Sequence, residues 1–213
     1  MVRKILICLL FIYGVNCTCT RVALTCQQIK HFVDGHNLHR QDAAFGHIPR
    51  QPAAANMNAL VWDEELAEKA ARWAENGLFA HNPDRTVPSK RWEQIGENVF
   101  YSTIYSPVGS VVPNLAEAMN GWFSEFMNYN FEPYSLEIAQ AVGHYTQMVW
   151  AESTKIGCGI SQKRENGFVT TLFVCDYGPT GNFIGETPYK ASPTRGYLHC
   201  GNEDCKRQYG AYC

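Results

Sequence analysis

The chain has 213 residues, of which 46% are hydrophobic and 18% are charged. This composition is typical of a folded domain and excludes the highly charged, hydrophobe-poor profile of a disordered chain. The formal net charge is -2, with 18 Lys and Arg against 20 Asp and Glu, and the sequence has no basic run. Nucleic-acid binding through phosphate neutralisation is therefore not expected, and the length favours one domain with a short appendage.

The first 19 residues have the three parts of a secretory signal peptide. Arg3 and Lys4 supply a positive start, Ile5 to Tyr13 form an apolar run, and small residues precede the end of the segment. The run is shorter than the roughly 20 helical residues that a bilayer requires, and no later run of the sequence is apolar enough to anchor the chain. We therefore expect residues 1–19 to be removed and the mature protein to be secreted and extracellular, without a transmembrane segment.

The sequence contains nine cysteines, which fits an oxidising compartment. Cleavage after position 16, 17 or 19 would leave eight, seven or six of them, and parity does not choose between eight and six. None lies between Tyr101 and Gly157, so the middle of the chain must be held by its hydrophobic core. Zinc-finger folds are excluded, because no Cys-x-x-Cys pair is followed by a second pair or by paired His.

Two helices are predicted in the first third of the chain. The first runs from Cys26 to about Asp42, with apolar residues recurring on one face. Asp63 is a good N-cap for the second, because its carboxylate can accept hydrogen bonds from the free amides of the first turn. Gly77 stands where this second helix should end.

Two further helices are predicted in the middle of the chain. Asn114 is followed three residues later by Glu117, as in a capping box. The apolar stripe of this third helix recurs at four, three and four residues, at Leu115, Met119, Trp122 and Phe126. A shorter helix is expected over about Ala141 to Glu152.

The hydrophobic period then changes from helical to extended. Lys155 to Ser161 and Phe168 to Tyr177 are rich in β-forming residues, and the Asn166-Gly167 step between them favours a tight turn. Cys158 and Cys175 lie in the two arms of this hairpin, and we predict a disulfide between them. Helices followed by strands, with too many helices for one face of a sheet, predict an α/β layered sandwich.

The last part of the chain differs from the rest in composition. From about Ile184 it is rich in Pro and Gly, has three cysteines and shows little apolar periodicity. Residues 185–213 are therefore predicted to form a cysteine-containing tail rather than a second domain.

Four polar side chains stand where local structure does not require them: His81, Glu97, Glu125 and His144. Glu97 lies between a glycine and an apolar run, where a carboxylate is rare without a partner. His144 lies in an apolar, aromatic run; considered alone, it is more often a satisfied core residue than a site residue. His36 and His39, three apart in the first helix, form a competing pair, for which surface positions are expected.

Three sequence motifs resemble the signatures of the CAP superfamily. They are the Gly96-Glu97-Asn98 triplet, the run GHYTQMVWAES from Gly143 to Ser153, and the run LFVCDYGPTGNF from Leu172 to Phe183. This superfamily contains the cysteine-rich secretory, antigen 5 and pathogenesis-related-1 proteins. The resemblance spans about Cys26 to Ile184 and is greatest to the venom-allergen-like proteins secreted by parasitic helminths.

The resemblance implies a fold, a domain extent and a site. The fold is a three-layer α-β-α sandwich with a central antiparallel sheet, and the CAP domain is assigned to residues 20–184. The family site consists of two His and two Glu at the floor of a large cleft. Matched motif by motif, it falls on the same four residues: His81, Glu97, Glu125 and His144.

Two interpretations of this site are open. Two neutral imidazoles and two carboxylates could hold one divalent cation, Zn²⁺ or another, with His81 and His144 as the ligands assigned to the metal. The alternative is a hydrogen-bonded His–Glu cluster that organises the cleft without metal.

The chain also departs from the family pattern. Asp176 stands where the second signature usually carries Asn or another polar residue. The middle-of-chain cysteines of many members are absent, so their disulfide connectivity cannot be copied. The tail has too few cysteines to resemble the ion-channel-regulating domain of larger members.

The function expected from the resemblance is extracellular lipid binding, with a sterol or a fatty acid as ligand. The segment from Val99 to Val112 is rich in apolar residues and contains Pro and Gly, which we interpret as an apolar surface loop. The residues assigned to lipid are Phe100, Tyr101, Ile104 and Tyr105. Two alternatives are a groove between the first and third helices for an acyl chain, and simple packing of these side chains under the loop.

The main alternative function is a metal-assisted extracellular hydrolase or peptidase that uses the His/Glu cluster. The sequence contains no HExxH, GxSxG, phosphate-loop or dinucleotide motif, and it suggests neither a nucleophile nor an oxyanion stabiliser. We therefore expect a binding protein and not an enzyme, with no catalytic residue, and a host extracellular protein as a further partner.

Overall fold

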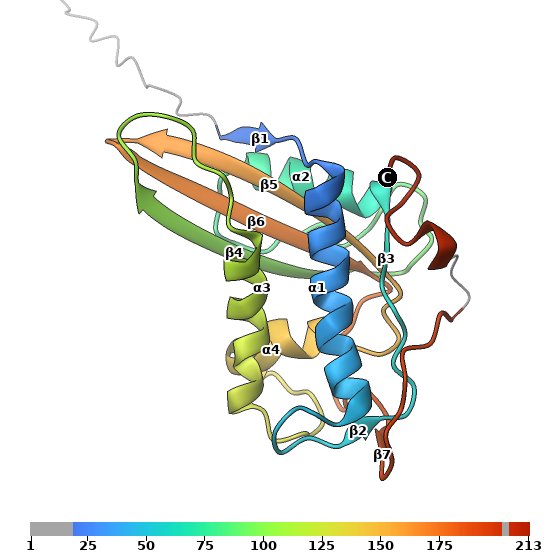
Figure 1. Ribbon diagram of the computed structural model, residues 1–213. Helices are drawn as coiled ribbons and strands as arrows, with labels where there is room; N and C mark the ends of the chain where they lie inside the picture. Colours follow the sequence, from blue (N-terminus) through green and yellow to red (C-terminus); the bar gives the residue numbers. More distant parts are fainter. Residues whose placement is uncertain (1–18, 202–204) are drawn as a thin grey trace, which may run out of the picture.

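The computed structural model describes residues 19–201 and 205–213. Apart from Cys19, the segment assigned to the signal peptide lies outside this range. A central sheet is covered on one face by α2 (Glu64–Glu75) and on the other by α1 (Cys26–Phe45) and α3 (Leu115–Ser124), as Figure 1 shows. The predicted three-layer α-β-α sandwich is therefore confirmed. Within the described residues, no helix is both long and apolar enough to cross a membrane.

The sheet is built mainly from three long antiparallel strands. β5 (Lys155–Glu165) and β6 (Phe168–Gly178) form the predicted hairpin, and β4 (Gly96–Tyr105) pairs with the outer edge of β6. The short β1 (Thr20–Val22) and β3 (Val61–Trp62) both pair with β5, β1 antiparallel and β3 parallel.

The turn between β5 and β6 is the tight turn that the sequence predicts. Asn166 and Gly167 have φ angles of 50° and 80°, the left-handed values that a two-residue hairpin turn requires. The turn brings Cys158 opposite Cys175 in the strand register, and a disulfide joins them.

Local signals determine where most of the helices begin and end. The Asp63 carboxylate caps α2 by accepting from the amides of Glu65 and Leu66. The Asn114 side chain caps α3 by accepting from the Glu117 amide. The first helix is longer than predicted.

α1 continues beyond the predicted Asp42 to Phe45, because Gly46 at φ 72° provides the left-handed residue that ends a helix. The last helix, α4, spans Ala139–Met148 and so ends before the predicted Glu152. The short 3-10 helix η1 (Glu125–Asn128) follows α3 directly.

Glycines in β5 allow α2 to lie directly on the sheet. A Cβ atom on Gly157 would stand 2.1 Å from the amide nitrogen of Ala67, and one on Gly159 would stand 2.2 Å from the Cα of Ala71. Both distances are shorter than real contacts, so the close approach of this helix requires glycine at these two positions.

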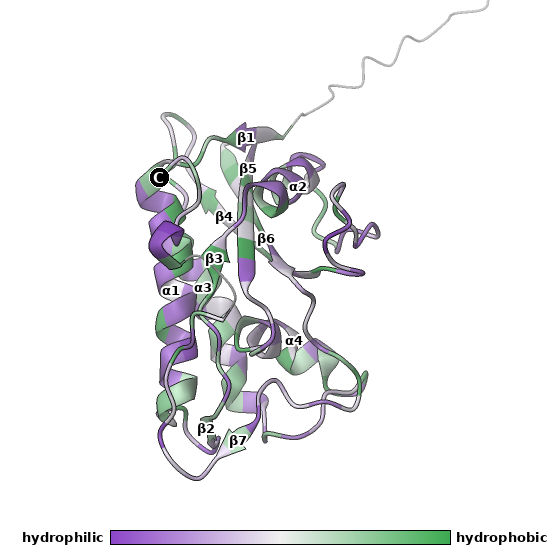
Figure 2. Cartoon of the chain, turned by 90° about the vertical axis from the view of Figure 1, so that its right-hand side faces the viewer, coloured by the Kyte–Doolittle hydropathy of each residue, from purple (hydrophilic) through white to green (hydrophobic). Residues whose placement is uncertain are grey.

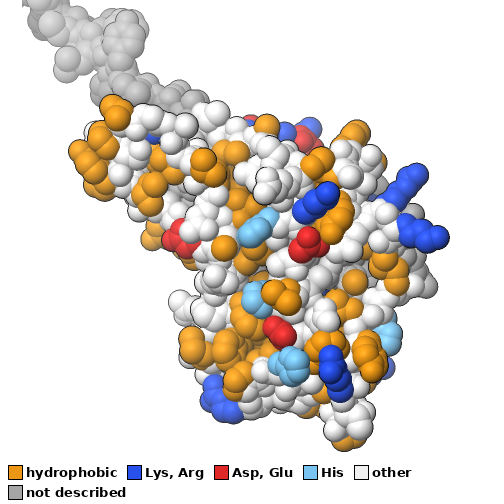
Figure 3. Space-filling model, viewed as in Figure 1, with side chains coloured by type: hydrophobic (Ala, Val, Ile, Leu, Met, Phe, Trp, Pro, Cys, Tyr) orange, Lys and Arg blue, Asp and Glu red, His pale blue; other side chains and the backbone are white. Residues whose placement is uncertain are grey.

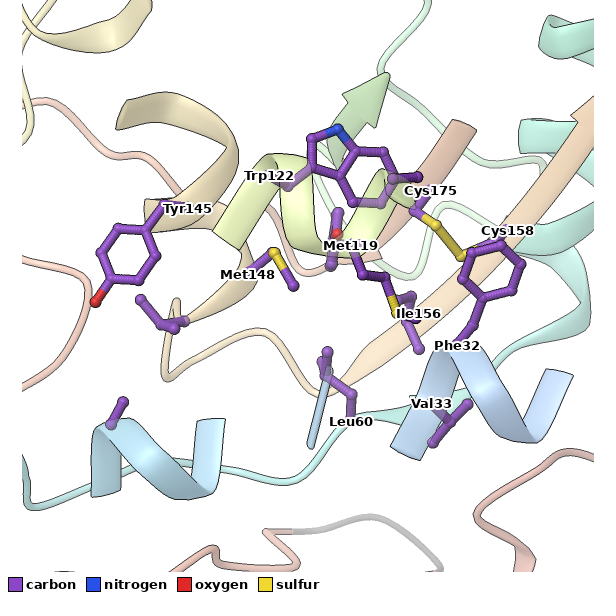
Figure 4. Close-up of a cluster of buried hydrophobic side chains, with 14 of the residues drawn as sticks. Phe32, Val33, Leu60, Met119, Trp122, Tyr145, Met148, Ile156, Cys158 and Cys175 are labelled. Atoms are coloured by element: carbon purple, nitrogen blue, oxygen red, sulfur yellow. A yellow bond between two sulfur atoms is a disulfide. The ribbon is translucent and has the colours of Figure 1, made fainter. Parts of the chain in front are cut away.

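The main core lies between the sheet and the α1/α3 layer. Figure 4 shows Phe32, Met119, Trp122 and Ile156 packed around the Cys158–Cys175 disulfide. The disulfide therefore lies inside the core and links two strands that the core already holds together.

The apolar loop predicted from Val99 to Val112 is the strand β4 as far as Tyr105, and only its second part, before α3, is a loop. Successive side chains of a strand point to opposite faces, so Phe100 contacts Gly121 of α3, whereas Tyr101 contacts Phe79 beyond α2. The apolar residues up to Tyr105 alternate between the two faces of this strand, and α3 covers one of these faces.

The four residues assigned to lipid therefore divide between the two faces of the sheet. Phe100 and Ile104 belong to the α3 side, and Tyr101 and Tyr105 to the α2 side.

The inter-helix groove considered for an acyl chain is filled where α1 crosses α3. A Cβ on Gly35 would stand 2.7 Å from the sulfur of Met119. One turn further along, the ring of His39 stacks on Phe123 with centroids 3.7 Å apart. The two helices are in direct contact at these residues.

The surface position expected for His36 is wrong. Its side chain is fully buried, between the Phe32 carbonyl oxygen at 2.8 Å from Nδ1 and the Tyr177 hydroxyl at 2.8 Å from Nε2. Burial lowers the pKa of His36 to about 3. His39 is half-buried against Phe123, and burial lowers its pKa as well.

A buried arginine ties α1 to the segment after α4. Arg40 is fully buried, and its guanidinium donates to five backbone carbonyls: those of Asn58, Met148, Trp150, Ala151 and Ser153. Burial lowers the pKa of Arg40 to about 9. Because a buried charge is costly without partners, the five carbonyl oxygens must stay around the Arg40 guanidinium, and this fixes the path of the backbone segments that carry them.

The C-terminal tail is bound to the body of the protein at several points. β7 (Ala191–Ser192) pairs with β2 (Ala53–Ala54), and a disulfide joins Cys26 to Cys213. A second tail disulfide joins Cys200 to Cys205, at the start of the 3-10 helix η2 (Cys205–Arg207).

Candidate functional site

A cleft of about 750 Å³ lies between the loop that follows α2 and helix α4. Figure 2 shows α2 and α4 on the same side of the molecule, with α4 below α2. The start of β4 and the segment 180–184 complete its lining. Three of the four predicted site residues, His81, Glu97 and His144, line this cleft.

The first His–Glu pair joins the loop after α2 to the start of β4. Nδ1 of His81 lies 2.7 Å from Oε1 of Glu97, which also accepts from the Asn82 amide at 3.0 Å. The Glu97 side chain is 1% exposed, and a guanidinium nitrogen of Arg85 lies 3.7 Å from the same oxygen. The carboxylate is thus buried with partners, as its sequence position requires.

The second pair joins α4 to the 3-10 helix after α3. Nδ1 of His144 lies 2.7 Å from Oε1 of Glu125. Oε2 of Glu125 accepts from the amides of His144 and Tyr145, at 2.9 and 3.1 Å. Glu125 therefore holds both the ring and the backbone of His144, and it supports the histidine without being part of the cleft lining.

The tautomer of both histidines follows from these contacts. A carboxylate can only accept a hydrogen bond, so Nδ1 of each ring carries the proton. Nε2 of each neutral ring is then left with its lone pair. The two rings lie 6.3 Å apart, centroid to centroid.

The donor set fits a divalent cation held by two imidazoles. Histidines that bind metals commonly donate their other ring N–H to a carboxylate, as His81 and His144 do here. Two imidazoles that bind the same tetrahedral Zn²⁺ have ring centroids about 5 Å apart. A shift of the His81 and His144 side chains by about 1 Å would bring their centroids to that separation.

The structure changes the role expected of the carboxylates. Glu97 and Glu125 are bonded to the histidines. Among the described residues, no group of three or more His, Cys, Asp or Glu is arranged to hold a metal ion. A cation in this cleft would therefore take its other ligands from water or from a bound molecule.

A buried hydrogen-bond network, which sequence reasoning missed, lies behind the second pair. The Asn98 side-chain amide donates to the His144 carbonyl oxygen and to the Tyr177 hydroxyl. The same hydroxyl contacts Nε2 of His36. The Gly96-Glu97-Asn98 motif could have suggested a role for Asn98, but nothing in the sequence indicates its partner 79 residues away.

Asp176 is the other site-proximal residue whose role the sequence did not predict. It lies opposite Glu97 in the strand register, is fully buried, and accepts no hydrogen bond from the described residues. Burial, and then the Glu97 carboxylate, raise the pKa of Asp176 well above its usual range. This departure from the family pattern thus places a second acid beside the first His–Glu pair.

The cleft offers little support for covalent catalysis. Its lining contains neither Ser nor Cys. The hydroxyl of Thr180 donates to the Gly181 carbonyl oxygen. Both carboxylates are engaged by histidines, so neither is free to activate a water molecule as a general base.

Comparison with known proteins identifies relatives of this chain. Residues 33–177 match the model of CAP, the cysteine-rich secretory protein family. The chain is 40% identical over 162 residues to GLIPR1-like protein 1 of Mus musculus, covering 73% of this chain and 63% of that protein. It is 36% identical over 177 residues to venom allergen 5 2 of Polybia paulista, covering 80% and 82%. The chain thus spans less than two thirds of the mouse protein's length.

Solved structures with the same architecture include venom-allergen-like proteins. Schistosoma mansoni venom allergen-like protein 4 is 30% identical, with a TM-score of 0.59 over 77% of this chain and 94% of that one. NaASP2, solved with Zn²⁺, is 27% identical, with a TM-score of 0.63 over 86% and 94%. On its motifs, its fold and these matches, the chain belongs to the CAP family of cysteine-rich secretory proteins and is venom-allergen-like.

Proposed function

We propose that this chain is a secreted, extracellular binding protein. We further propose that its cleft holds a divalent cation between His81 and His144, and that Zn²⁺ is the preferred cation. The observation that carries the proposal is the pair of 2.7 Å contacts that commit each Nδ1–H to a carboxylate. This arrangement orients each ring and leaves Nε2 as a metal donor. The likeness to NaASP2, a protein whose structure was solved with Zn²⁺, supports the choice of cation.

Binding is preferred to metal-assisted hydrolysis because the cleft lining supplies no Ser or Cys nucleophile and because both carboxylates are engaged by histidines. A cation held by two imidazoles would act as an anchor for a bound molecule, with water or that molecule completing its coordination. Secretion is supported by the signal-like first 19 residues and by the disulfides. A host extracellular protein is a further partner proposed from the likeness to venom-allergen-like proteins.

Native mass spectrometry in the presence of Zn²⁺ tests the cation site. We expect one Zn²⁺ bound at neutral pH and none in the variant that combines His81→Ala with His144→Ala. His47→Ala is the matched control, because His47 is an exposed histidine outside the cleft that lies 3.4 Å from Asp42. Failure of the wild-type protein to bind Zn²⁺, or binding that survives in the double variant, would refute the site.

A second candidate function is the binding of a sterol or a fatty acid. It is favoured by the exposed apolar side chains along the outer half of β4: Tyr101, Ile104 and Tyr105. The ring of Phe79 adds to this surface, 4.5 Å from that of Tyr101. Phe100 lies on the opposite face of the sheet, where it packs against Trp122 and Phe173.

Competition with labelled cholesterol and labelled palmitate tests this second function. Tyr101→Asp combined with Tyr105→Asp should abolish binding, and His81→Ala with His144→Ala should leave it unchanged. If neither cholesterol nor palmitate binds at micromolar protein concentration, this function is wrong.

A further inference from the structure

The free end of the sheet carries an exposed apolar surface, here called the apolar tip. It is formed by the end of β4, the loop between β4 and α3, and the start of β6, through Ile104, Tyr105, Val108, Val112 and Phe168. Exposure ranges from 46% for Ile104 to 82% for Val112. Figure 3 shows hydrophobic side chains gathered at this end of the molecule, at the upper left.

The tip projects because the strands continue past the helix that covers them. α2 ends at Glu75, and its last turn meets β5 at Ser161, whose hydroxyl donates to the Ala74 carbonyl oxygen. β5 continues to Glu165, and β4 continues to Tyr105 opposite Phe168. Figure 1 shows the three long strands extending beyond the helices at this end.

Side chains satisfy four carbonyl groups of the loop between β4 and α3. Arg164 donates to the carbonyls of Ser106 and Gly109, the Ser106 hydroxyl donates to that of Val108, and Gln162 donates to that of Val111. An exposed loop can leave such groups to water, whereas a segment that enters a low-dielectric phase must bond them internally.

The shape and the aromatic side chains of the tip favour a lipid surface over a pocket ligand. None of its five residues lines the cleft or the two hollows beside α2, so the tip projects without enclosing a single acyl chain. Tyr105 packs edge-on against Phe168, and tyrosine is enriched where membranes meet water. The charged residues at this end of β5 are engaged within the protein: Arg164 donates to the loop carbonyls, and Lys163 pairs with Glu165.

We propose that the apolar tip inserts into the interfacial region of a lipid bilayer and so holds the protein on a membrane surface. The proposal builds on the lipid-binding function above, because Ile104 and Tyr105 take part in both. It adds a distinct partner: an intact bilayer that receives the loop residues Val108 and Val112.

Co-sedimentation with vesicles tests the proposal. The vesicles are of phosphatidylcholine, alone or mixed in equal parts with phosphatidylserine. The wild-type protein should partition onto both. Val108→Ser combined with Val112→Ser should weaken partitioning at least tenfold, because each buried CH₂ contributes about 0.8 kcal/mol and about 1.4 kcal/mol is a factor of ten.

A matched control removes apolar surface elsewhere without changing the charge. Leu38 and Leu136 are 60% and 77% exposed and lie outside the tip, so Leu38→Ser with Leu136→Ser should partition like the wild-type protein. Equal losses in the two double variants would overturn the proposal, as would a wild-type protein that sediments with neither vesicle. Unchanged thermal unfolding of both variants checks that they fold.

The two lipid functions fail independently in these assays. If the tip variant loses vesicle binding but still competes for soluble labelled palmitate, both functions stand and use different surfaces. If the wild-type protein binds vesicles but no soluble lipid, the lipid-binding function falls and the bilayer contact stands.

Discussion

Two regions of this protein use histidine in opposite ways. In the core, Nδ1 of His36 donates to the Phe32 carbonyl and Nε2 accepts from the Tyr177 hydroxyl, so both ring nitrogens are occupied. In the cleft, His81 and His144 also donate through Nδ1, each to a carboxylate. The difference lies at Nε2, which a hydroxyl occupies in the core and which a ligand can reach in the cleft.

We therefore propose that the partner of the second nitrogen decides whether a histidine of this fold serves the structure or binds a ligand. A buried ring with both nitrogens satisfied stabilises the fold and resists protonation. A ring that is held at one nitrogen and open at the other is oriented for binding at little cost to the fold. Substitutions in the core should therefore reduce stability, and those in the cleft should reduce binding.

The largest effect is expected for Arg40→Met, in the core. Removing the guanidinium leaves five buried carbonyl groups without their donor, which should destabilise the protein by about 3–5 kcal/mol. The comparison is Arg21→Met, which removes a partly exposed arginine paired with Glu68 and should cost at most about 1 kcal/mol. Chemical denaturation measures both, and equal losses would show that the carbonyl cluster does not organise the core.

His36→Gln should cost about 1–3 kcal/mol, because one or both buried partners lose their hydrogen bond. It should also change the pH dependence of unfolding. The pKa of His36 is lowered to about 3 in the folded protein from an ordinary 6.5. Protons therefore bind first to the unfolded chain, and stability is full above 6.5 and is lost as the pH falls towards 3.

The measurement for His36 is the free energy of unfolding as a function of pH. The wild-type curve should fall over this acid range, and the curve of the variant should be flatter. A variant that loses stability in acid as steeply as the wild-type protein would contradict the assignment of this loss to His36.

Asp176→Asn is expected to act in the opposite direction, with a gain on the order of 1 kcal/mol at neutral pH. Because burial and the Glu97 carboxylate raise the pKa of Asp176, the folded protein holds a proton that the unfolded chain releases above the usual 3.8. Its contribution to stability is therefore largest in acid and falls as the pH rises.

The charged groups near Asp176 are Glu97 in β4, Lys69 in α2 and Arg85 in the loop that follows α2. Thermal unfolding at neutral and acid pH measures the gain, which should shrink in acid. A loss of stability at neutral pH would show that Asp176 is held as a charged partner of Lys69 or Arg85.

The smallest effect on stability is expected in the cleft. His81→Ala should change the free energy of unfolding by less than about 1 kcal/mol, because the ring is half-exposed and the buried Glu97 carboxylate keeps the Asn82 amide and Arg85 as partners. The same substitution should remove Zn²⁺ binding. A large loss of stability would show that His81, like His36, mainly stabilises the fold.

The sequence predicted the elements that depend on local signals. The caps at Asp63 and Asn114 and the Asn166-Gly167 turn are chemical features of adjacent residues, and all three are present in the structure. The strand β4 was missed because apolar and polar residues are mixed along it and because Pro and Gly follow it. This pattern fits a loop equally well.

The sequence motifs predicted which side chains of the candidate site come together, but not how they bond to one another. The motifs identified all four residues, but no local pattern shows that each carboxylate would bond to a histidine 16 or 19 residues away. The buried position of His36 depends on Tyr177, 141 residues along the chain. The same holds for Asp176, which meets Glu97 only through the β4–β6 register. Contacts of this kind exist only once the sheet has formed.

The contrast between core and cleft histidines can be observed by NMR of the ring nitrogens with and without Zn²⁺. We predict that Nδ1 of His36, His81 and His144 is protonated in the metal-free protein. Zn²⁺ should then shift the Nε2 resonances of His81 and His144 and leave that of His36 in place. Unchanged Nε2 resonances of both cleft histidines in excess Zn²⁺ would contradict the assigned roles, as would a shift at His36 alone.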